Sequence, residues 1–205
     1  MATSAYGLEL WRPTLPGWSH DILPFYARLA EELPVAPSVV EIGVAWGRSL
    51  VFLASRLALR GSIAAALWGV DSWAPASELW TEADLPRAAA LHKGKAMLRV
   101  LVEHATDEEL AMIRVLQLES AKAADLFAPA SFDVVFVDGD HSRAGADVLA
   151  WASKVKPGGL LCGHDYHADA WPQVVADVDQ FARDFVGKTF EPLTVEGTVW
   201  ALRKR

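Results

Sequence analysis

The chain has 205 residues, a formal net charge of −7 and a sequence pI near 5.3. A domain of this length can bury roughly 70% of the surface that its unfolded chain exposes, so it needs neither disulfides nor a structural metal for stability. The acidic balance disfavours a nucleic-acid partner, because nucleic acids attract basic surfaces, and the single cysteine, Cys162, excludes an intrachain disulfide.

The N-terminal stretch MATSAYGLELWRP lacks a basic segment followed by a long apolar core, so we expect no signal peptide. No window approaches about 20 consecutive apolar residues, so we expect neither a membrane span nor a membrane partner. Together with the lone cysteine, these features favour a cytoplasmic protein. Residues 1–36 are predicted to form an N-terminal helical extension or cap, with one helix at residues 19–32, ahead of a single domain at residues 37–205.

Apolar runs typical of buried strands alternate with helical patterns along this domain. The predicted strands lie at 38–44, 63–71, 112–120, 132–140 and, after a turn, within 156–166. The predicted helices lie at 47–59, 86–104, 121–127, 142–154 and 170–185. The tail KTFEPLTVEGTVWALRKR predicts two further strands joined around Glu196 and Gly197, which should pair antiparallel. The alternation indicates an α/β fold with a mostly parallel sheet covered by helices on both faces.

The stretch EIGVAWGRS (41–49) joins the first predicted strand to a helix and contains Gly43 and Gly47. Ligands of open α/β sheets bind beyond the carboxyl ends of the strands, and glycine lets the backbone approach a ligand closely. A phosphate loop is rejected, because the lysine and the spacing of GxxxxGK[ST] are missing. A dinucleotide site is disfavoured, because Ala45 replaces the middle glycine of GxGxxG and Glu41 would repel a diphosphate.

A sulfonium cofactor reverses that electrostatic argument. S-adenosylmethionine carries an ammonium and a sulfonium group but no phosphate, so a carboxylate at Glu41 favours its binding. Asp71 ends the second strand, where its carboxylate can accept both ribose hydroxyls; capping of the next turn is its alternative role. Trp73 is expected to stack on adenine, and Trp46 to lie near the methionine tail. The cofactor site is also expected to include Gly43, Gly47, Ser49, Ser72 and Asp138.

These motifs resemble those of class I S-adenosylmethionine-dependent methyltransferases, and the likeness runs over residues 39–166. EIGVAWGRS resembles the first motif of that family, GVDSW the second-strand acid, and VLQLESA the third motif. The resemblance implies a Rossmann-like fold with a seven-stranded, mostly parallel sheet, an antiparallel last strand and helices on both faces. It also implies that Glu119 and Ser120 lie beside adenine.

Within that superfamily, DGDHS (138–142) and GHDY (163–166) resemble small-molecule O-methyltransferases that act on antibiotic sugars or on catechols. In those relatives a divalent metal, usually magnesium, lies between the ends of the fourth and fifth strands. The resemblance implies that Asp138, His164 and Asp165 hold it. His164 stands where the relatives have an acid, and histidine suits zinc, manganese or iron better than magnesium. Orienting the cofactor and the loop by hydrogen bonds is the alternative role of the two aspartates.

Methylation of an alkyl or sugar hydroxyl needs a base, a metal or both, because the pKa of such a hydroxyl is high. The resemblance makes Asp140 the leading candidate for the base. His141 is the second candidate, because histidine titrates near neutral pH. Capping of the following helix is the alternative role for this pair. Trp80 and Trp171 follow the second and fifth strands and are expected to line the acceptor pocket.

The sequence thus predicts methyl transfer from S-adenosylmethionine to a hydroxyl of a small metabolite of the sugar or natural-product type, with or without a divalent metal. Three alternatives stay open: a methyltransferase-like protein with metal-dependent hydroxylase activity, an NAD-dependent oxidoreductase, and a non-catalytic partner subunit. The expected partner is a small-molecule acceptor. A homo-oligomer formed through the tryptophan-rich N-terminus also stays open.

Overall fold

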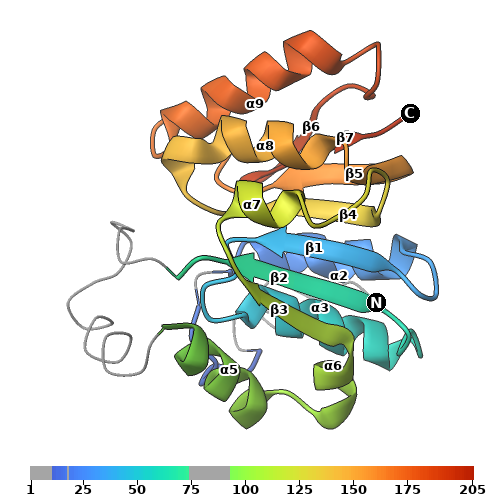
Figure 1. Ribbon diagram of the computed structural model, residues 1–205, viewed down its shortest axis with the longest axis vertical. Coiled ribbons are helices and arrows are strands. Elements are labelled where there is room, and N and C mark those ends of the chain that lie inside the picture. The colour runs from blue at the N-terminus through green and yellow to red at the C-terminus, as the bar shows by residue number, and fades with distance from the viewer. Residues whose placement is uncertain (1–10, 18, 74–92) are drawn as a thin grey trace.

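The computed structural model of the chain describes residues 11–17, 19–73 and 93–205. Its strands are β1 (Ser38–Ile42), β2 (Ala66–Asp71), β3 (Ile113–Gln117), β4 (Phe132–Val137), β5 (Val155–Gly163), β6 (Thr194–Glu196) and β7 (Val199–Arg203). They form one seven-stranded sheet in the order β3-β2-β1-β4-β5-β7-β6 (Figure 1).

The sheet has its topological switch point between β1 and β4. β1 pairs in parallel with β2 on one side and with β4 on the other, so the chain leaves β1 in one direction for β2 and β3 and later returns for β4 and β5. β7 pairs antiparallel with both β5 and β6. The predicted fold, a mostly parallel sheet with an antiparallel last strand, is confirmed. Ligands of such sheets bind where the strand order reverses, at the carboxyl ends of the strands.

The helices are α2 (Ile22–Glu32), α3 (Arg48–Leu59), α5 (Lys93–His104), α6 (Asp107–Met112), α7 (Ser120–Ala124), the 3-10 helix η1 (His141–Arg143), α8 (Ala144–Ala152) and α9 (Pro172–Phe185). They cover both faces of the sheet (Figure 1). Successive strand residues point to opposite faces. Accordingly, Val39 packs in one core with α2 and α3, whereas Val40 packs in the other with α7, α8 and α9.

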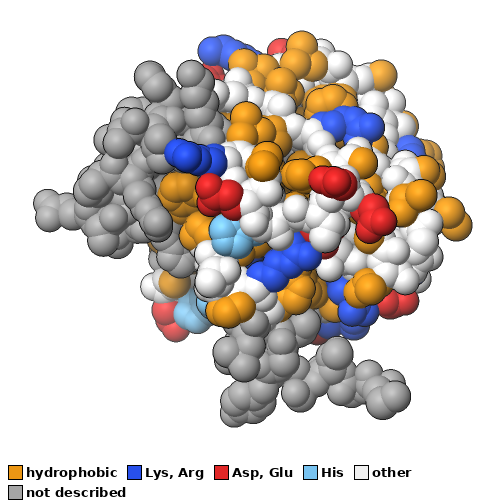
Figure 2. Space-filling view, turned by 90° about the horizontal axis from the view of Figure 1, so that it is seen from below, with side chains coloured by type: hydrophobic (Ala, Val, Ile, Leu, Met, Phe, Trp, Pro, Cys, Tyr) orange, Lys and Arg blue, Asp and Glu red, His pale blue; other side chains and the backbone are white. Residues whose placement is uncertain are grey.

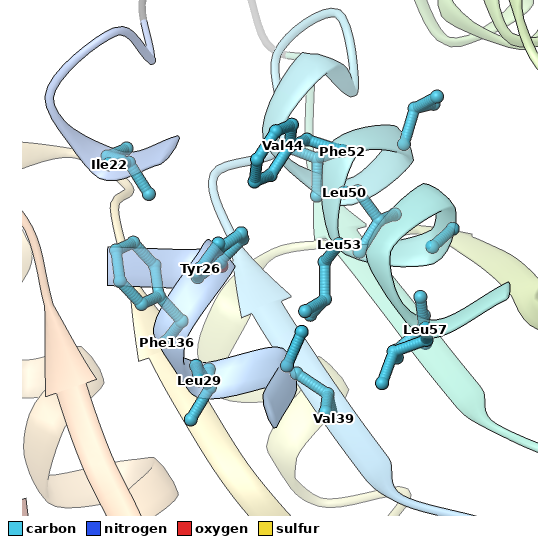
Figure 3. Close-up of a cluster of buried hydrophobic side chains, with 14 of the residues drawn as sticks. Ile22, Tyr26, Leu29, Val39, Val44, Leu50, Phe52, Leu53, Leu57 and Phe136 are labelled. Carbon is cyan, nitrogen blue, oxygen red and sulfur yellow. The ribbon is translucent and has the colours of Figure 1, made fainter. Parts of the chain in front are cut away.

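The core under α2 and α3 follows helical spacing (Figure 3). Ile22, Tyr26 and Leu29 recur along one face of α2, and Leu50, Leu53 and Leu57 along one face of α3. The two helices pack on each other and on the strands, so the N-terminal segment is built into this core from residue 22 onward. The ring of Tyr26 meets that of Phe136 on β4 at 5.0 Å.

One helix was missed by the sequence analysis. α6 begins with a capping box, in which the Thr106 side chain accepts from the Glu109 backbone N–H and the Glu109 carboxylate accepts from the Thr106 backbone N–H. The carboxylate of Glu109 also binds Arg12 in a bidentate ion pair, with both N–O distances at 2.8 Å. The predicted helix at 86–104 is described only from residue 93, as α5; its earlier part, like Trp80, lies outside the described residues.

The face of the molecule seen in Figure 2 carries side chains of both charges with hydrophobic side chains between them. The described part of this face therefore shows mixed charge and no field of a single sign. Among the helices that the structure describes, none is both long enough and apolar enough to cross a bilayer.

Candidate cofactor and acceptor site

The glycine turn after β1 owes its glycines to packing within the protein. Gly43 and Gly47 have φ of +87° and +79°, a region that favours glycine. A Cβ on Gly43 would lie 2.0 Å from the Asp138 carbonyl oxygen, so β4 could not approach β1 as it does with any other residue there. A Cβ on Gly47 would lie 3.0 Å from the side chains of Met97 and Leu101 on α5.

Asp71, at the end of β2, holds this turn. Its Oδ2 accepts from the Ala45 backbone N–H at 2.9 Å, and its Oδ1 accepts from the Trp73 backbone N–H at 2.7 Å. The indole of Trp73 donates to the Ala45 carbonyl at 2.9 Å and is 5% exposed. The capping role considered for Asp71 is thus present in the structure, and its role toward a ribose stays a prediction.

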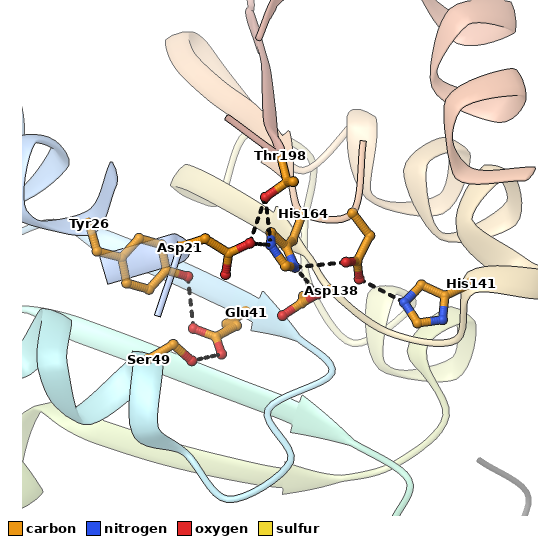
Figure 4. A network of polar contacts seen from close by, with 9 residues as sticks. Asp21, Tyr26, Glu41, Ser49, Asp138, His141, His164 and Thr198 are labelled. Atoms are coloured by element: carbon orange, nitrogen blue, oxygen red, sulfur yellow. Dashed lines mark hydrogen bonds and ion pairs between the residues drawn. The ribbon is translucent and has the colours of Figure 1, made fainter. Parts of the chain in front are cut away.

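Glu41 lies inside the protein beneath the same turn (Figure 4). It is 1% exposed, its Oε2 accepts from the Tyr26 hydroxyl at 2.7 Å, and its Oε1 accepts from the Ser49 hydroxyl. Burial raises the pKa of Glu41 to about 7. Both Glu41 oxygens thus accept hydrogen bonds from other residues of the protein. The predicted attraction of Glu41 for a bound cation would therefore act through its electric field and not by direct contact.

The remaining predicted cofactor residues lie at neighbouring strand ends. Trp46 is buried in the glycine turn, and Ser72 is exposed directly after β2. Glu119 is the N-cap residue of α7 and pairs with Lys122 on the same helix, at 3.1 Å. The hydroxyl of Ser120 accepts from the indole N–H of Trp151 at 2.9 Å. The roles predicted for these four residues toward a cofactor stay predictions.

The structure brings Asp138, His164 and Asp165 together at the ends of β4 and β5. His164 Nδ1 lies 3.4 Å from Asp138 Oδ1 and 3.1 Å from Asp165 Oδ1. One ligand atom from each residue lies within 4.8 Å of the others, as in a set that can hold a metal ion. Two carboxylates and one imidazole match the donors of manganese, zinc or iron sites better than the all-oxygen shell of magnesium.

Charge is concentrated in this cluster. Burial alone would favour a neutral ring, but hydrogen bonds to Asp138, Asp165 and Asp21 raise the pKa of His164 to about 12. Burial raises the pKa of Asp138. Burial would also raise that of Asp165, but hydrogen bonds from His141 and His164 lower the pKa of Asp165 below its usual range. In the metal-free protein the imidazolium of His164 therefore neutralises part of the carboxylate charge.

The two candidate bases have different surroundings, although both line one pocket with the cluster. Asp140 is exposed, and its Oδ1 accepts from the backbone N–H of Ser142 at 2.9 Å and from its hydroxyl at 2.7 Å, which caps η1. His141 Nε2 lies 2.7 Å from Asp165 Oδ2. Its ring stacks on that of Trp171, with centroids 3.7 Å apart and planes 12° from parallel. The structure thus holds the ring of His141 on two sides.

Sequence reasoning missed three residues of this network (Figure 4). Tyr26 binds Glu41, as described above. Asp21 Oδ2 accepts from His164 Nε2 at 2.7 Å and from the Thr198 hydroxyl at 2.8 Å. The pairs are 143 and 177 residues apart in the chain, so no local motif could have indicated them.

Comparison with known proteins gives the following matches. A family model described as "Methyltransferase domain" matches residues 40–166, which is more than half of the chain. No curated protein matches significantly. Similar solved structures include the O-methyltransferase NovP, with 18% identity, coverage of 90% of this chain and 80% of that chain, and a TM-score of 0.65.

Two further structures are similar in the same way. Cofactor-bound Rv0187 from MTB has 16% identity, coverage of 98% and 85%, and a TM-score of 0.62. A protein from Corynebacterium glutamicum has 15% identity, coverage of 98% and 87%, and a TM-score of 0.65. At these identities the structural matches bear on the fold, and the family match bears on the chemistry.

Proposed function

We propose that this chain, which belongs to the methyltransferase-domain family and is an S-adenosylmethionine-dependent methyltransferase, methylates a hydroxyl group of a small metabolite of the sugar or natural-product type. The observation that carries the proposal is the paired His141 and Asp165 in a pocket at the strand ends, beside the glycine turn. A hydroxyl acceptor needs such a base, because its pKa lies far above neutral pH. The similar structure NovP is named as an O-methyltransferase.

Residues at the ends of β1 and β2 would bind the cofactor. The turn around Gly43 and Gly47 would take the methionine tail at the N-terminus of α3, and the carboxylate of Asp71, at the end of β2, would accept the ribose hydroxyls. Burial raises the pKa of Glu41 to about 7, so a bound cation favours its ionised form, whereas a pyrophosphate disfavours that form. This arrangement supports S-adenosylmethionine over a nicotinamide dinucleotide.

In the acceptor half, we assign the base role to His141. With Nε2–H donating to Asp165, Nδ1 is the unprotonated nitrogen and can take the proton of the acceptor hydroxyl. The acceptor oxygen forms its bond to the methyl carbon as the carbon–sulfur bond breaks, which releases S-adenosylhomocysteine. Asp165 stabilises the imidazolium that results, by the same logic as the aspartate of a catalytic triad. Asp140, the leading candidate from sequence, stays the alternative, since only one of its oxygens is engaged in the cap.

A divalent metal is the second part of the proposal. Asp138, His164 and Asp165 would hold it, and their oxygen and nitrogen donors suit manganese, zinc or iron. Such an ion, when bound, polarises the acceptor hydroxyl and lowers its pKa. The protein residues orient the acceptor and take its proton, whichever ion is present.

Methyl transfer from isotopically labelled S-adenosylmethionine to a panel of paired small molecules, each carrying either a hydroxyl or an amine at the same position, tests the acceptor class. We expect label in ether products only, formed about 10²–10⁴-fold more slowly when His141→Gln replaces the wild type. Label confined to the amine members of the panel would reject hydroxyl methylation.

A further inference from the structure

Asp21 stands immediately before α2, at the position where an aspartate usually caps the helix. Its side chain makes no capping hydrogen bond. Instead, Oδ2 accepts from His164 Nε2 at 2.7 Å and from the Thr198 hydroxyl at 2.8 Å. The side chain of Asp21 is therefore committed to the histidine and not to its own helix.

Thr198 closes this contact from the other side. It lies in the turn between β6 and β7, and its Oγ1 is 2.9 Å from His164 Nε2. The Nε2 edge of the ring thus meets an oxygen from the N-terminal segment and an oxygen from the C-terminal hairpin (Figure 4). Both oxygens lie on the side of the ring away from Asp138 and Asp165.

This contact decides which nitrogen of His164 faces the pocket. The ring nitrogens are distinct, and the hydrogen bond made by one determines what the other can do. Because Nε2–H is taken by Asp21, Nδ1 is the nitrogen that faces Asp138 and Asp165, at 3.4 and 3.1 Å. A histidine that binds a metal through one nitrogen usually donates the other N–H to a carboxylate in this manner.

We propose that Asp21, supported by Thr198, is a positioning residue that fixes the ring of His164 with Nδ1 directed at Asp138 and Asp165. The inference rests on the metal-assisted part of the proposed function. Among the described residues, His164 is the one imidazole in the proposed metal site, and Asp21 is the residue that binds the other nitrogen of its ring. It also gives the N-terminal segment a role in the chemistry, since the segment delivers the carboxylate.

The charge of Asp21 supports this role. Asp21 Oδ2 and His164 Nε2 lie 2.7 Å apart as an ion pair. Hydrogen bonds to an ionised acceptor are roughly twice as strong as neutral ones. Loss of such an outer carboxylate typically costs about 10–100-fold in metal affinity.

A purely structural role for Asp21 makes a different prediction. Arg28, on α2, forms an ion pair with Glu196 on β6, which ties this helix to the same hairpin without touching His164. Arg28→Gln is therefore a matched control. If Asp21 only attached α2 to the hairpin, Asp21→Ala and Arg28→Gln would have equal effects on the site.

The first test measures Mn²⁺ binding by electron paramagnetic resonance of the free ion, with S-adenosylmethionine affinity measured in parallel by calorimetry. We expect Asp21→Ala to weaken Mn²⁺ binding roughly 10–100-fold, Asp21→Asn to weaken it less, and Arg28→Gln to leave it unchanged. Affinity for S-adenosylmethionine should stay the same in all three variants. Wild-type Mn²⁺ affinity in Asp21→Ala, or equal losses in Asp21→Ala and Arg28→Gln, would overturn the inference.

The second test needs no metal and separates the inference from the proposed function. If the wild type binds none of Mn²⁺, Zn²⁺ and Fe²⁺, the metal-assisted part of the proposed function fails, and the orientation of His164 is decided by NMR of the ring protons. We expect a downfield, slowly exchanging Nε2–H signal, identified by its loss in His164→Gln, that disappears in Asp21→Ala and persists in Arg28→Gln. Persistence of that signal in Asp21→Ala, or its absence from the wild type, would refute the positioning role.

Discussion

Asp165 Oδ2 lies 2.7 Å from His141 Nε2, while Oδ1 of the same carboxylate lies 3.1 Å from His164 Nδ1. One carboxylate thus connects the proposed base to the cluster proposed to hold a metal. Its position follows from topology, because Asp165 comes just after β5 and His141 just after β4, and these strands are parallel neighbours. Proton removal by His141 and orientation of the acceptor by the metal would therefore involve the two oxygens of the same residue, Asp165.

The two candidate bases are separated by substitution. His141→Gln should lower kcat by about 10²–10⁴-fold, the usual contribution of a general base, because Gln cannot take the proton. Asp140→Asn keeps an oxygen that can accept from Ser142 and should retain most of the activity. Steady-state kinetics with both variants, together with cofactor affinity by calorimetry, make the comparison. Full activity in His141→Gln with a large loss in Asp140→Asn would return the base role to Asp140.

Trp171 should influence catalysis through its stacking on His141. Stacked aromatic pairs contribute about 0.5–1.5 kcal/mol beyond their area burial, so Trp171→Ala should lower kcat by about 2–13-fold. Trp171→Phe, which retains a ring for stacking, should recover most of that loss. Stopped-flow single-turnover measurements isolate the chemical step. An equal loss in the Phe and Ala variants would mean that stacking on His141 is not the reason for the effect.

Asp71 is expected to determine cofactor affinity. Asp71→Ala removes the acceptor for the ribose and also releases the backbone N–H groups of Ala45 and Trp73. Hydrogen bonds to a charged group contribute about 1.5–3 kcal/mol each, so affinity for S-adenosylmethionine should fall by on the order of 100-fold or more. Calorimetry gives the value, and thermal unfolding of the ligand-free variant measures the part due to the turn. Unchanged affinity would remove Asp71 from the cofactor site.

Stability should depend on pH through Glu41. Its pKa is raised from 4.5 to about 7 in the folded protein, so between these values the folded state holds a proton that the unfolded state has lost. Stability from this group is full below pH 4.5 and decreases as pH rises toward 7. The decrease is on the order of 3 kcal/mol.

Urea unfolding at pH 5 and pH 8 gives the free energy of unfolding of the wild type and of Glu41→Gln, whose side chain cannot ionise. The other titrating groups are present in both proteins, so the difference between them isolates Glu41. We expect the wild type to lose more stability than Glu41→Gln over this interval. Parallel pH profiles for the two proteins would show that the Glu41 carboxyl does not titrate there.

The sequence was sufficient wherever a local pattern determines the structure. Apolar runs and helical spacing predicted the strands and most helices, and the carboxyl ends of parallel strands brought Asp138, His141 and Asp165 together as expected. The explanation of Gly43 was incomplete, because its missing Cβ makes room for the Asp138 carbonyl in addition to any ligand. That contact joins β1 to β4 and cannot be seen in the sequence around position 43.

Other features depended on contacts between distant segments or on a signal that was overlooked. Asp21 reads locally as a helix cap, and only the folded chain shows that its carboxylate is directed to His164 instead. The helix α6, in contrast, has a local signal in the sequence, because Thr106 and Glu109 have the spacing of a capping box. The helix is only six residues long and runs directly into β3, so its apolar pattern could not be distinguished from that of the strand.

The central claim is that the glycine turn between β1 and α3, with Glu41 beneath it and Asp71 at its edge, binds a cationic nucleoside without phosphates. Isothermal titration calorimetry of the wild-type protein with S-adenosylmethionine and, separately, with NADH tests it most directly. We predict saturable one-to-one binding of S-adenosylmethionine and no heat of binding with NADH. Saturable NADH binding in a protein that gives no heat with S-adenosylmethionine would contradict the claim.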